Sequence, residues 1–276
     1  MFDYNILYFW RPKMDYSITL NDLIKLVKEA RPLVFDRELA NDISAKGSCD
    51  FVTRADKLVQ DFIKKRVAEL YPDCRFMGEE STDHSIDKHL PTFVLDPIDG
   101  TTNFIHDFCL SAISLALVIN GESVLGVVYN PFTDDMYAAE KGKGATLNGK
   151  PIHVSETKTL DESIVMLGAM PYHKEVSGPL FPLYHEMFMK CVDIRRLGSA
   201  ALEICYVAAG RAEFHFEAYL GPWDVAAAML ILREAGGTFS DWEGNEVDLY
   251  KEQLFVASSN THMHKPMLDL IKKHRG

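Results

Sequence analysis

The segment VLDPIDGTT, at residues 94–102, places two carboxylates three residues apart. Asp96 and Asp99 flank Pro97 and Ile98, and both the proline and the following Asp-Gly pair favour a turn. Such a turn lets the two carboxylates converge while the carbonyl of Ile98 points outward. Hard oxygen donors of this kind suit Mg²⁺ better than a soft metal. Ordinary turn acids would show the same pattern, so the segment alone leaves both interpretations open.

Two further segments carry acids that could join the same centre. Glu79 in GEES closes a strand-like run, and its neighbour Glu80 adds a second charge that must be solvated or bound to a metal. Asp224 in WDVAAAMLILREAGG begins a helix that is apolar nearly all round and is expected to be buried. The alternatives are a solvated loop for the glutamates and a helix N-cap for Asp224. A cap and a metal ligand are compatible at Asp224 only if different oxygens serve each role.

Thr101 follows Gly100 where a turn or helix is expected to begin. Free backbone N–H groups at Gly100, Thr101 and Thr102 would form a phosphate site, and the Thr101 hydroxyl could orient a water. An N-cap is the alternative role for Thr101. Asp56 fits a capping box with Thr53, because the spacing Thr-x-x-Asp matches that motif. Local spacing therefore explains Asp56 without a functional role.

Two other patterns indicate no site. The segment KGKGATLNG has glycines like a phosphate loop, but it lacks the spacing G-x-x-x-x-G-K-[ST] and lies among hairpin signals. We therefore interpret it as a series of turns. The histidines show no H-x-x-x-H or other metal spacing, and we assign no role to His106, His153, His173 or His215.

The spacing of apolar residues predicts the elements that position these acids. Residues 20–30 and 53–72 carry apolar side chains on one helical face, and Pro72 ends the second helix. The segments RFMG and TFVLD are expected to be short strands that end at the acids. Residues 110–155 alternate strand-like runs with Asn-Gly, Asn-Pro and Gly-x-Gly turns, which predicts an antiparallel meander.

The last third of the chain alternates strands with helices, which indicates a layered α/β lobe. Strands are predicted at 163–169, 193–198, 212–217, 238–242 and 254–259, and helices at 180–191, 199–210, 223–237 and from near Lys265. We predict an N-terminal α+β lobe at residues 1–150 that carries most metal ligands. A C-terminal α/β lobe at residues 151–276 would carry Asp224 and the substrate contacts.

Composition is that of an ordinary globular protein. The chain has 276 residues, of which 47% are apolar and 25% charged, and its formal net charge is −11. This acidic balance argues against nucleic-acid binding, whereas an anionic substrate stays compatible because bound cations reverse the local field. No apolar run reaches the ~18–20 residues that a membrane span needs, so we expect no membrane partner. An odd number of cysteines without a CxxC pair indicates free thiols and a cytoplasmic location.

The N-terminal segment carries an aromatic run that is compatible with several interpretations. The aromatic run at residues 5–10 lacks the basic region and the cleavage site of a signal peptide. A strand, an added surface segment and an artefact ahead of Met14 all stay open.

Several motifs together resemble the inositol monophosphatase family. GEES, LDPIDGTTNF and WDVAAAMLILREAGG are similar to its three metal-site motifs, in the same order. The likeness continues through KGSCDFVTRAD, GVVYNP, RRLGSAALEICYVAAG and LFVASSN, and it covers the chain from about Asp15 onward. It implies a layered αβαβα sandwich of the α+β or α/β class. It also implies Mg²⁺-dependent, lithium-sensitive phosphomonoesterase activity and a homodimer, while the aromatic N-terminus has no counterpart in the family.

The resemblance implies a role for each acid in holding metal. Glu79, Asp96 and the carbonyl of Ile98 resemble the ligands of a first Mg²⁺. Asp96, Asp99 and Asp224 resemble the ligands of a second. We therefore expect two or three Mg²⁺ per site, whose charge would offset the repulsion among the carboxylates.

The resemblance also implies catalytic and substrate-binding residues. Glu79 and Thr101 would orient and activate the attacking water, and Asp56 would be an outer acid linked to Thr101 or to a weak third metal. Lys46 resembles a lysine of a mobile loop, and other positions align with contacts to the hydroxyls of the substrate. The expected substrate-binding set is Lys46, Asp99, Gly100, Thr101, Gly198, Ser199, Ala200, Glu217 and Asp224.

The reaction that the resemblance implies is hydrolysis of a small phosphomonoester by in-line attack of a metal-activated water. The segment GSAALE and Glu217 favour myo-inositol monophosphate as the substrate, with NADP, fructose 1,6-bisphosphate and 3′-phosphoadenosine phosphates as alternatives. A haloacid-dehalogenase-type phosphatase carries D-x-D-G-T, whereas the acids here are spaced D-x-x-D. A non-catalytic metal-binding regulatory protein is the alternative of another class, and it would leave Thr101 and the substrate-side residues without a common purpose.

Overall fold

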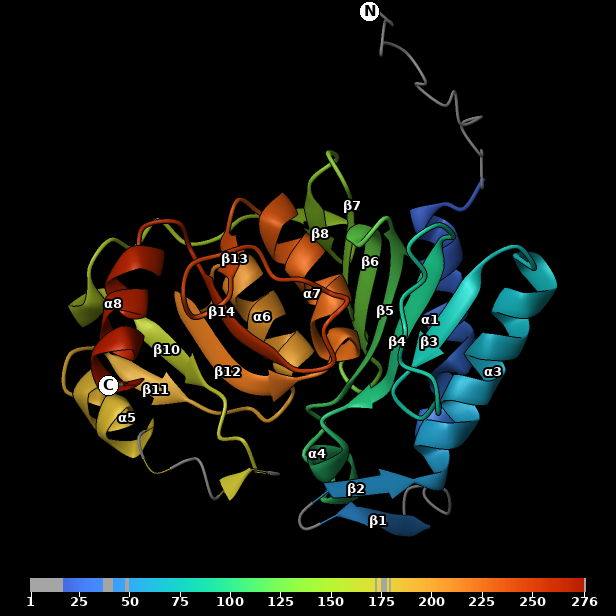
Figure 1. Ribbon diagram of the computed structural model, residues 1–276, viewed down its shortest axis with the longest axis horizontal. Helices are drawn as coiled ribbons and strands as arrows, with labels where there is room; N and C mark the ends of the chain where they lie inside the picture. The colour runs from blue at the N-terminus through green and yellow to red at the C-terminus, as the bar shows by residue number, and fades with distance from the viewer. Residues whose placement is uncertain are drawn as a thin grey trace, which may run out of the picture.

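Alternating helical layers and sheets form the molecule, as Figure 1 shows. The computed structural model describes residues 17–36, 42–47, 50–171, 173–174, 178 and 180–275, and for residues 46, 47, 50 and 275 it describes the backbone alone. The aromatic N-terminal run lies outside the described residues. From one side to the other, the layers are α1 with α3, a seven-stranded sheet, α6 with α7, a five-stranded sheet, and α5 with α8. The predicted αβαβα sandwich is confirmed.

The helices predicted from apolar spacing are present, and a short helix, α4, follows Gly100, where a turn or helix is expected. Their bounds are α1 Leu20–Val34, α3 Arg54–Leu70, α4 Thr101–Ile105, α5 Leu180–Phe188, α6 Ala200–Ala208, α7 Pro222–Glu234 and α8 His264–Arg275, with a 3₁₀ turn η1 at Leu160–Glu162. Among the described residues, no helix combines the length and the apolar character needed to cross a bilayer.

The larger sheet has the strand order β3-β4-β5-β6-β7-β8-β9. Its strands are β3 Arg75–Gly78, β4 Thr92–Asp99, β5 Ala112–Ile119, β6 Glu122–Asn130, β7 Asp135–Glu140, β8 Ala145–Leu147 and β9 Lys150–Ile152. β3 runs parallel to β4, and all other neighbours are antiparallel. The meander predicted for residues 110–155 is therefore confirmed, and within KGKGATLNG the residues 141–144 and 148–149 connect strand β8 to its neighbours. A separate antiparallel pair, β1 (Ile43–Gly47) and β2 (Asp50–Thr53), precedes α3.

The smaller sheet has the order β11-β10-β12-β14-β13. Its strands are β10 Ile164–Leu167, β11 Asp193–Arg195, β12 Phe214–Leu220, β13 Thr238–Ser240 and β14 Leu254–Ser259. β10 is parallel to β11 and β12, while β14 is antiparallel to β12 and β13. The strands and helices predicted for the last third are all present. The division into lobes at residue 150 stays a prediction.

Three apolar cores join the layers. One lies between the larger sheet and α1 with α3, and another lies between the smaller sheet and α5 with α8. The middle core surrounds α6 and α7, and the α7 residues from Val225 to Leu232 are all buried. The prediction that this helix is buried nearly all round is confirmed. The middle layer thus holds the first turn of α7, where Asp224 lies, against the larger sheet.

Close contact between α7 and the larger sheet depends on a glycine. A Cβ added at Gly126 of β6 would lie 2.8 Å from the carbonyl oxygen of Ala227 and 3.1 Å from its Cα. Both atoms belong to the backbone of a buried helix, so they have little room to yield. The absence of a side chain at Gly126 lets the helix and the strand approach.

We expect Gly126→Ala to lower the free energy of unfolding by about 1–3 kcal/mol, because the added methyl group overpacks this contact. Urea denaturation measures the change. Glu122→Ala, at the exposed start of the same strand, is the control and should change stability by less than about 0.5 kcal/mol. Equal midpoints for Gly126→Ala and the wild type would contradict the packing argument.

Candidate active site

The end of β4 folds its two aspartates toward one point. β4 pairs with β5 through Asp96 opposite Ser114 and then Asp99 opposite Ala112, and the register shifts between the two pairs. The N–H of Ile98 donates to Oδ1 of Asp96 at 2.9 Å. Only 1% of Asp96 and 6% of Asp99 is exposed. The turn predicted around the proline is thus a bulge that buries both carboxylates.

A third carboxylate reaches the same point from α7. Single oxygens of Asp96, Asp99 and Asp224 all lie within 4.8 Å of one another. Three buried carboxylates at this separation repel strongly unless a cation compensates their charge. An all-oxygen set of this kind is the donor set that hard divalent cations prefer. The residues present therefore fit a divalent metal.

Burial and this repulsion both raise the pKa values of these acids. Burial raises the pKa of Asp96 well above its ordinary value, and the charges of Glu79, Asp99 and Asp224 raise it further. Burial likewise raises the pKa of Asp224, with added repulsion from Asp99 and Glu79. A bound cation would reverse these shifts, because it favours the ionised carboxylates.

Glu79 follows β3 at the strand end beside β4. Its N–H donates to the carbonyl of Leu95 at 3.1 Å, and Glu79 lines the same cavity as the aspartates. The turn is held from behind, since the N–H of Glu80 donates to Oε1 of Gln60 at 2.9 Å. A Cβ at Gly78 would lie 2.2 Å from that Oε1, so Gly78 leaves the space that Gln60 fills. Glu79 thus lies beside the aspartates but outside the close group of Asp96, Asp99 and Asp224, and its role as a metal ligand stays a prediction.

Asp56 serves a cap with one oxygen and Thr101 with the other. Its Oδ2 accepts from the N–H of Thr53 at 2.8 Å and from the Thr53 hydroxyl at 2.5 Å, so the predicted capping box is confirmed. Its Oδ1 accepts from the Thr101 hydroxyl at 3.3 Å. Burial raises the pKa of Asp56 to about 7, against the hydrogen bonds from Thr53. The cap and the contact with Thr101 are therefore both present.

The N-cap alternatives for Thr101 and Asp224 are wrong. Gly100, with φ of 89°, is the N-cap of α4, and Thr101 is the first helical residue, so Thr101 is not a cap. Gly221 is the N-cap of α7, and Asp224 is the third helical residue. Oδ2 of Asp224 accepts from the N–H of Gly221 at 2.6 Å. Pro222 at the first helical position, a common helix start, is the signal that could have placed the cap correctly.

The start of α6 holds Asp99 from the other half of the chain. The Ser199 hydroxyl donates to Oδ2 of Asp99 at 2.5 Å, the N–H of Ala200 to Oδ1 at 3.2 Å and the N–H of Ala201 to Oδ2 at 2.8 Å. Burial raises the pKa of Asp99 to about 7, and these donors oppose the shift. Ser199 and Ala200 thus position a metal-site acid. Their contact with substrate hydroxyls, like that of Gly198, stays a prediction.

A cavity of about 780 Å³ opens beside the carboxylates. The predicted residues that line it are Glu79, Asp96, Ile98, Asp99, Gly100, Thr101, Gly198, Ala200, Glu217 and Asp224. The side chain of Lys46 lies outside the described part of the chain. Lys174 and Arg196 also line the cavity and suit an anionic ligand. Sequence reasoning missed both, because no spacing relates them to the acids.

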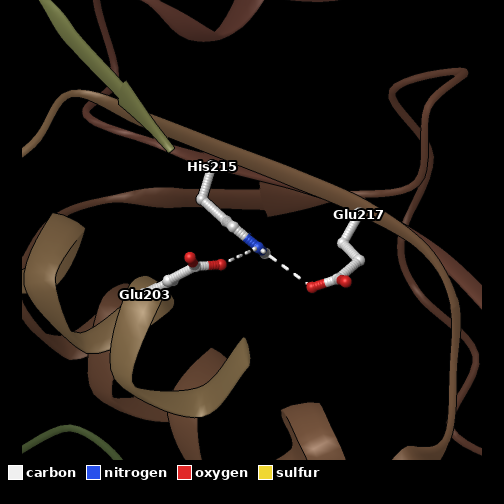
Figure 2. A group of neighbouring side chains, drawn as sticks. All are labelled: Glu203, His215 and Glu217. Carbon is white, nitrogen blue, oxygen red and sulfur yellow. Dashed lines mark ion pairs between the residues drawn. The ribbon is translucent and has the colours of Figure 1, made fainter. Parts of the chain in front are cut away.

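Figure 2 shows a second cluster of ionisable side chains, Glu203, His215 and Glu217, of which Glu217 also lines the cavity. Nε2 of His215 lies 3.4 Å from Oε2 of Glu203 and 3.6 Å from Oε2 of Glu217. Sequence reasoning assigned His215 no role, and it missed Glu203. The alternation Glu-x-His-x-Glu at residues 213–217 was the available signal, since it places these side chains on one face of a strand.

The sequence profile of the inositol monophosphatase family matches residues 13–275. The chain belongs to the inositol monophosphatase family. It is 35% identical over 263 residues to the inositol-1-monophosphatase of Rhizobium meliloti (strain 1021), which covers 94% of this chain and 98% of that protein. It is 40% identical over 229 residues to the Nus factor SuhB of Salmonella typhimurium (strain LT2), covering 83% of this chain and 85% of that protein. An IMPase structure from Thermotoga maritima matches with a TM-score of 0.82 at 32% identity, over 93% of this chain and 97% of that one.

Membership confirms the resemblance seen in the sequence and makes this inositol monophosphatase relative a metal-dependent phosphatase. The carboxylates that converge at the cavity agree with that dependence. Family membership therefore favours an enzyme over the alternative of a non-catalytic metal-binding protein. The choice among phosphomonoester substrates depends on the residues that line the cavity.

The hydroxyls of Thr53 and Thr101 both donate to Asp56, and we expect their removal to have different effects on stability and kcat. Thr101→Ala should lower kcat by ~10²–10⁴-fold, the usual range for loss of positioned acid–base help, with little change in melting temperature. Thr53→Ala should instead lower stability by about 0.5–2 kcal/mol, because it removes the cap of α3, while most of kcat is kept. Phosphate release and thermal melting on both variants measure this. Near-normal kcat in Thr101→Ala would refute its role in the reaction.

Proposed function

We propose that the protein hydrolyses myo-inositol monophosphate with Mg²⁺ as its cofactor. The observation that carries the proposal is the convergence of Asp96, Asp99 and Asp224 at a cavity whose lining also includes Glu217. The acids supply a cation site, and Glu217 supplies a hydrogen-bond acceptor for hydroxyl groups. A small polyhydroxylated phosphomonoester offers a partner to each.

Glu79, Asp96 and the carbonyl of Ile98 would hold one Mg²⁺, and Asp96, Asp99 and Asp224 a second. When bound, such cations supply Lewis-acid charge to the phosphate oxygens and to the leaving oxygen. Asp56 lies behind Thr101 and could help to hold a third ion. The shared carboxylate of Asp96 makes it the acid on which the whole set depends.

Thr101 and Glu79 are proposed to act on the attacking water. The Thr101 hydroxyl donates its one proton to Asp56, or to the Ile98 carbonyl at 3.2 Å, so its oxygen can only accept from a water. A water that donates to Thr101 turns a lone pair away from it, toward the phosphate. The carboxylate of Glu79, in the same cavity, can take the second proton of that water.

The substrate side supports a hydroxyl-rich leaving group. Gly198, Ala200 and Glu217 line the cavity on the C-terminal half of the chain, and Arg196 and Lys174 add positive charge. The backbone N–H groups of residues 100–102 would assist in binding phosphate, and Lys46 would join from its loop. NADP, fructose 1,6-bisphosphate and 3′-phosphoadenosine phosphates are the alternative substrates within the family.

We further propose lithium sensitivity, a homodimer and a cytoplasmic location, as the family resemblance implies. Cys74, Cys109, Cys191 and Cys205 are free thiols, in keeping with a reducing compartment. The likeness to the Nus factor SuhB favours a second candidate role, binding to a protein partner, in addition to phosphatase activity.

Chelation should abolish activity while the fold persists, because the acids lie at a cavity and three separate apolar cores hold the layers together. Readdition of Mg²⁺ should restore phosphate release. Asp96→Asn should stay inactive at every Mg²⁺ concentration, since one side chain would serve both ions. Circular dichroism is the control. Global unfolding in chelator would indicate a structural metal, and an Asp96→Asn variant with near-normal kcat would refute the shared ligand.

A phosphate-release panel at fixed Mg²⁺ should rank myo-inositol 1-phosphate by kcat/KM above NADP, fructose 1,6-bisphosphate and 3′-phosphoadenosine 5′-phosphate. The reason is that Glu217 would pair with free hydroxyls near the phosphate. A higher kcat/KM for one of the other three would replace the substrate but keep the reaction. A phosphorylated aspartate trapped during turnover would instead indicate covalent chemistry of the haloacid-dehalogenase type.

A further inference from the structure

Three ionisable side chains meet in the interior. Glu203 comes from α6, and His215 and Glu217 come from β12, with their side chains directed toward one another in Figure 2. The side chains of His215 and Glu203 are 0% and 1% exposed, while that of Glu217 is 13% exposed and lines the cavity. Glu217 is therefore the member of the cluster that a substrate can reach.

Ser258 shows which way the imidazole is protonated. Nδ1 of His215 lies 3.0 Å from the Ser258 hydroxyl oxygen, and that hydroxyl donates to the carbonyl of His215 at 3.4 Å. Since the serine uses its proton on the carbonyl, its oxygen accepts from Nδ1–H. Nδ1 is thus a donor, and the remaining question is whether Nε2 carries a proton too.

Nε2 faces two carboxylate oxygens, one from Glu203 and one from Glu217. It makes no directed hydrogen bond to any described residue, and it lies 3.4 Å from the Glu203 oxygen and 3.6 Å from the Glu217 oxygen. A lone pair at Nε2 would repel both carboxylates, and the interior would then hold two uncompensated charges. A proton on Nε2 turns this repulsion into attraction and compensates one of the two charges. The cluster is therefore consistent with an imidazolium between two carboxylates.

Glu203 extends the cluster to the turn before α6. Its Oε1 accepts from the N–H of Leu197 and from the N–H of Gly198 at 3.3 Å. On the other side, a Cβ at Gly168 would lie 2.2 Å from Cγ of Glu217, so Glu217 packs directly against the backbone there. Glu217 is held from behind by Gly168 and paired with a ring that Glu203 and Ser258 hold.

We propose that His215 is a positioning residue that holds the Glu217 carboxylate in one orientation for the hydroxyls of the substrate. This inference rests on the proposed function and deepens it. The ligand class is a phosphomonoester whose leaving group carries free hydroxyls. A phosphomonoester without hydroxyls near the phosphate gains nothing from Glu217 and should be indifferent to His215.

The charge on His215 also sets a pH limit. Burial lowers the pKa of His215, but pairing with Glu203 and Glu217 outweighs burial and raises it to about 9. The ring is then charged below about 9 and loses its proton as the pH rises through that value. The ionisable groups that face it are Glu203 from α6 and Glu217 from its own strand, while β14 and β10 contribute Ser258 and Met166 beside it.

The test compares myo-inositol 1-phosphate with p-nitrophenyl phosphate in wild type, His215→Phe and His215→Gln. In both variants, KM for the inositol phosphate should rise about tenfold or more, the value of a hydrogen bond to a charged group, while kcat changes less. KM for p-nitrophenyl phosphate should stay constant. His264→Gln is the matched control, since His264 bonds Ser240 and Ser259 on the far side of β14 and should leave both KM values unchanged.

Two further measurements separate positioning from simple packing. Glu217→Gln should raise KM for the inositol phosphate, and adding His215→Phe to it should raise KM little further, because both changes remove one contact. In the wild type, KM for the inositol phosphate should rise above about pH 9 relative to that for p-nitrophenyl phosphate, and the ratio should be flat in His215→Gln. The wild-type profile decides the question even if a variant folds poorly.

The outcomes are distinct. Unchanged KM in folded His215 variants, equal rises for both substrates, or fully additive effects with Glu217→Gln would each overturn the role of His215. Zinc bound to the wild type in stoichiometric amount and lost in His215→Phe would overturn the imidazolium and indicate a metal in its place. A wild type that releases no phosphate from any hydroxyl-bearing substrate would overturn the proposed function itself, before any variant is compared.

Discussion

Repulsion among buried carboxylates is the constraint on which the rest of the structure depends. Asp96, Asp99 and Asp224 are brought within a few ångströms at the ends of β4 and α7. Backbone N–H groups hold each of them in place, yet burial still raises all of their pKa values. Hydrogen bonds orient these acids but do not neutralise them. The three acids therefore form a site that suits metal cations. The layered fold brings the end of β4 and the first turn of α7 together at this site.

Local sequence patterns predicted the elements and most of the acids. Apolar periodicity gave the helices and the meander, and the acids that end β3 and β4 were candidates from their position alone. Helix caps were less secure, because they depend on backbone angles. Thr101 was weighed as a cap, but the left-handed Gly100 takes that role, and Gly221 rather than Asp224 caps α7. In both cases the acid or hydroxyl lies inside the helix, where it is available to the cavity.

The remaining parts of the site depend on contacts between distant segments. Lys174 and Arg196 reach the cavity from loops that no local spacing connects to Asp96. Glu203 and His215 lie on a helix and a strand that pack together only in the folded chain. Buried polar groups of this kind read as ordinary surface residues in a sequence, and their role becomes visible only when the core around them is known.

The two carboxylate clusters use different solutions to the same problem, and α6 connects them. Before its first turn, residues 197 and 198 donate to Glu203, and at its start residues 199–201 donate to Asp99. Glu217 and Glu203 also raise the pKa of Asp99, so the charge of the inner cluster is felt at the metal site. A proton on His215 lowers that negative charge without occupying a cation site. Glu217 lines the cavity and also faces His215, so the cavity and the inner cluster share one electrostatic environment.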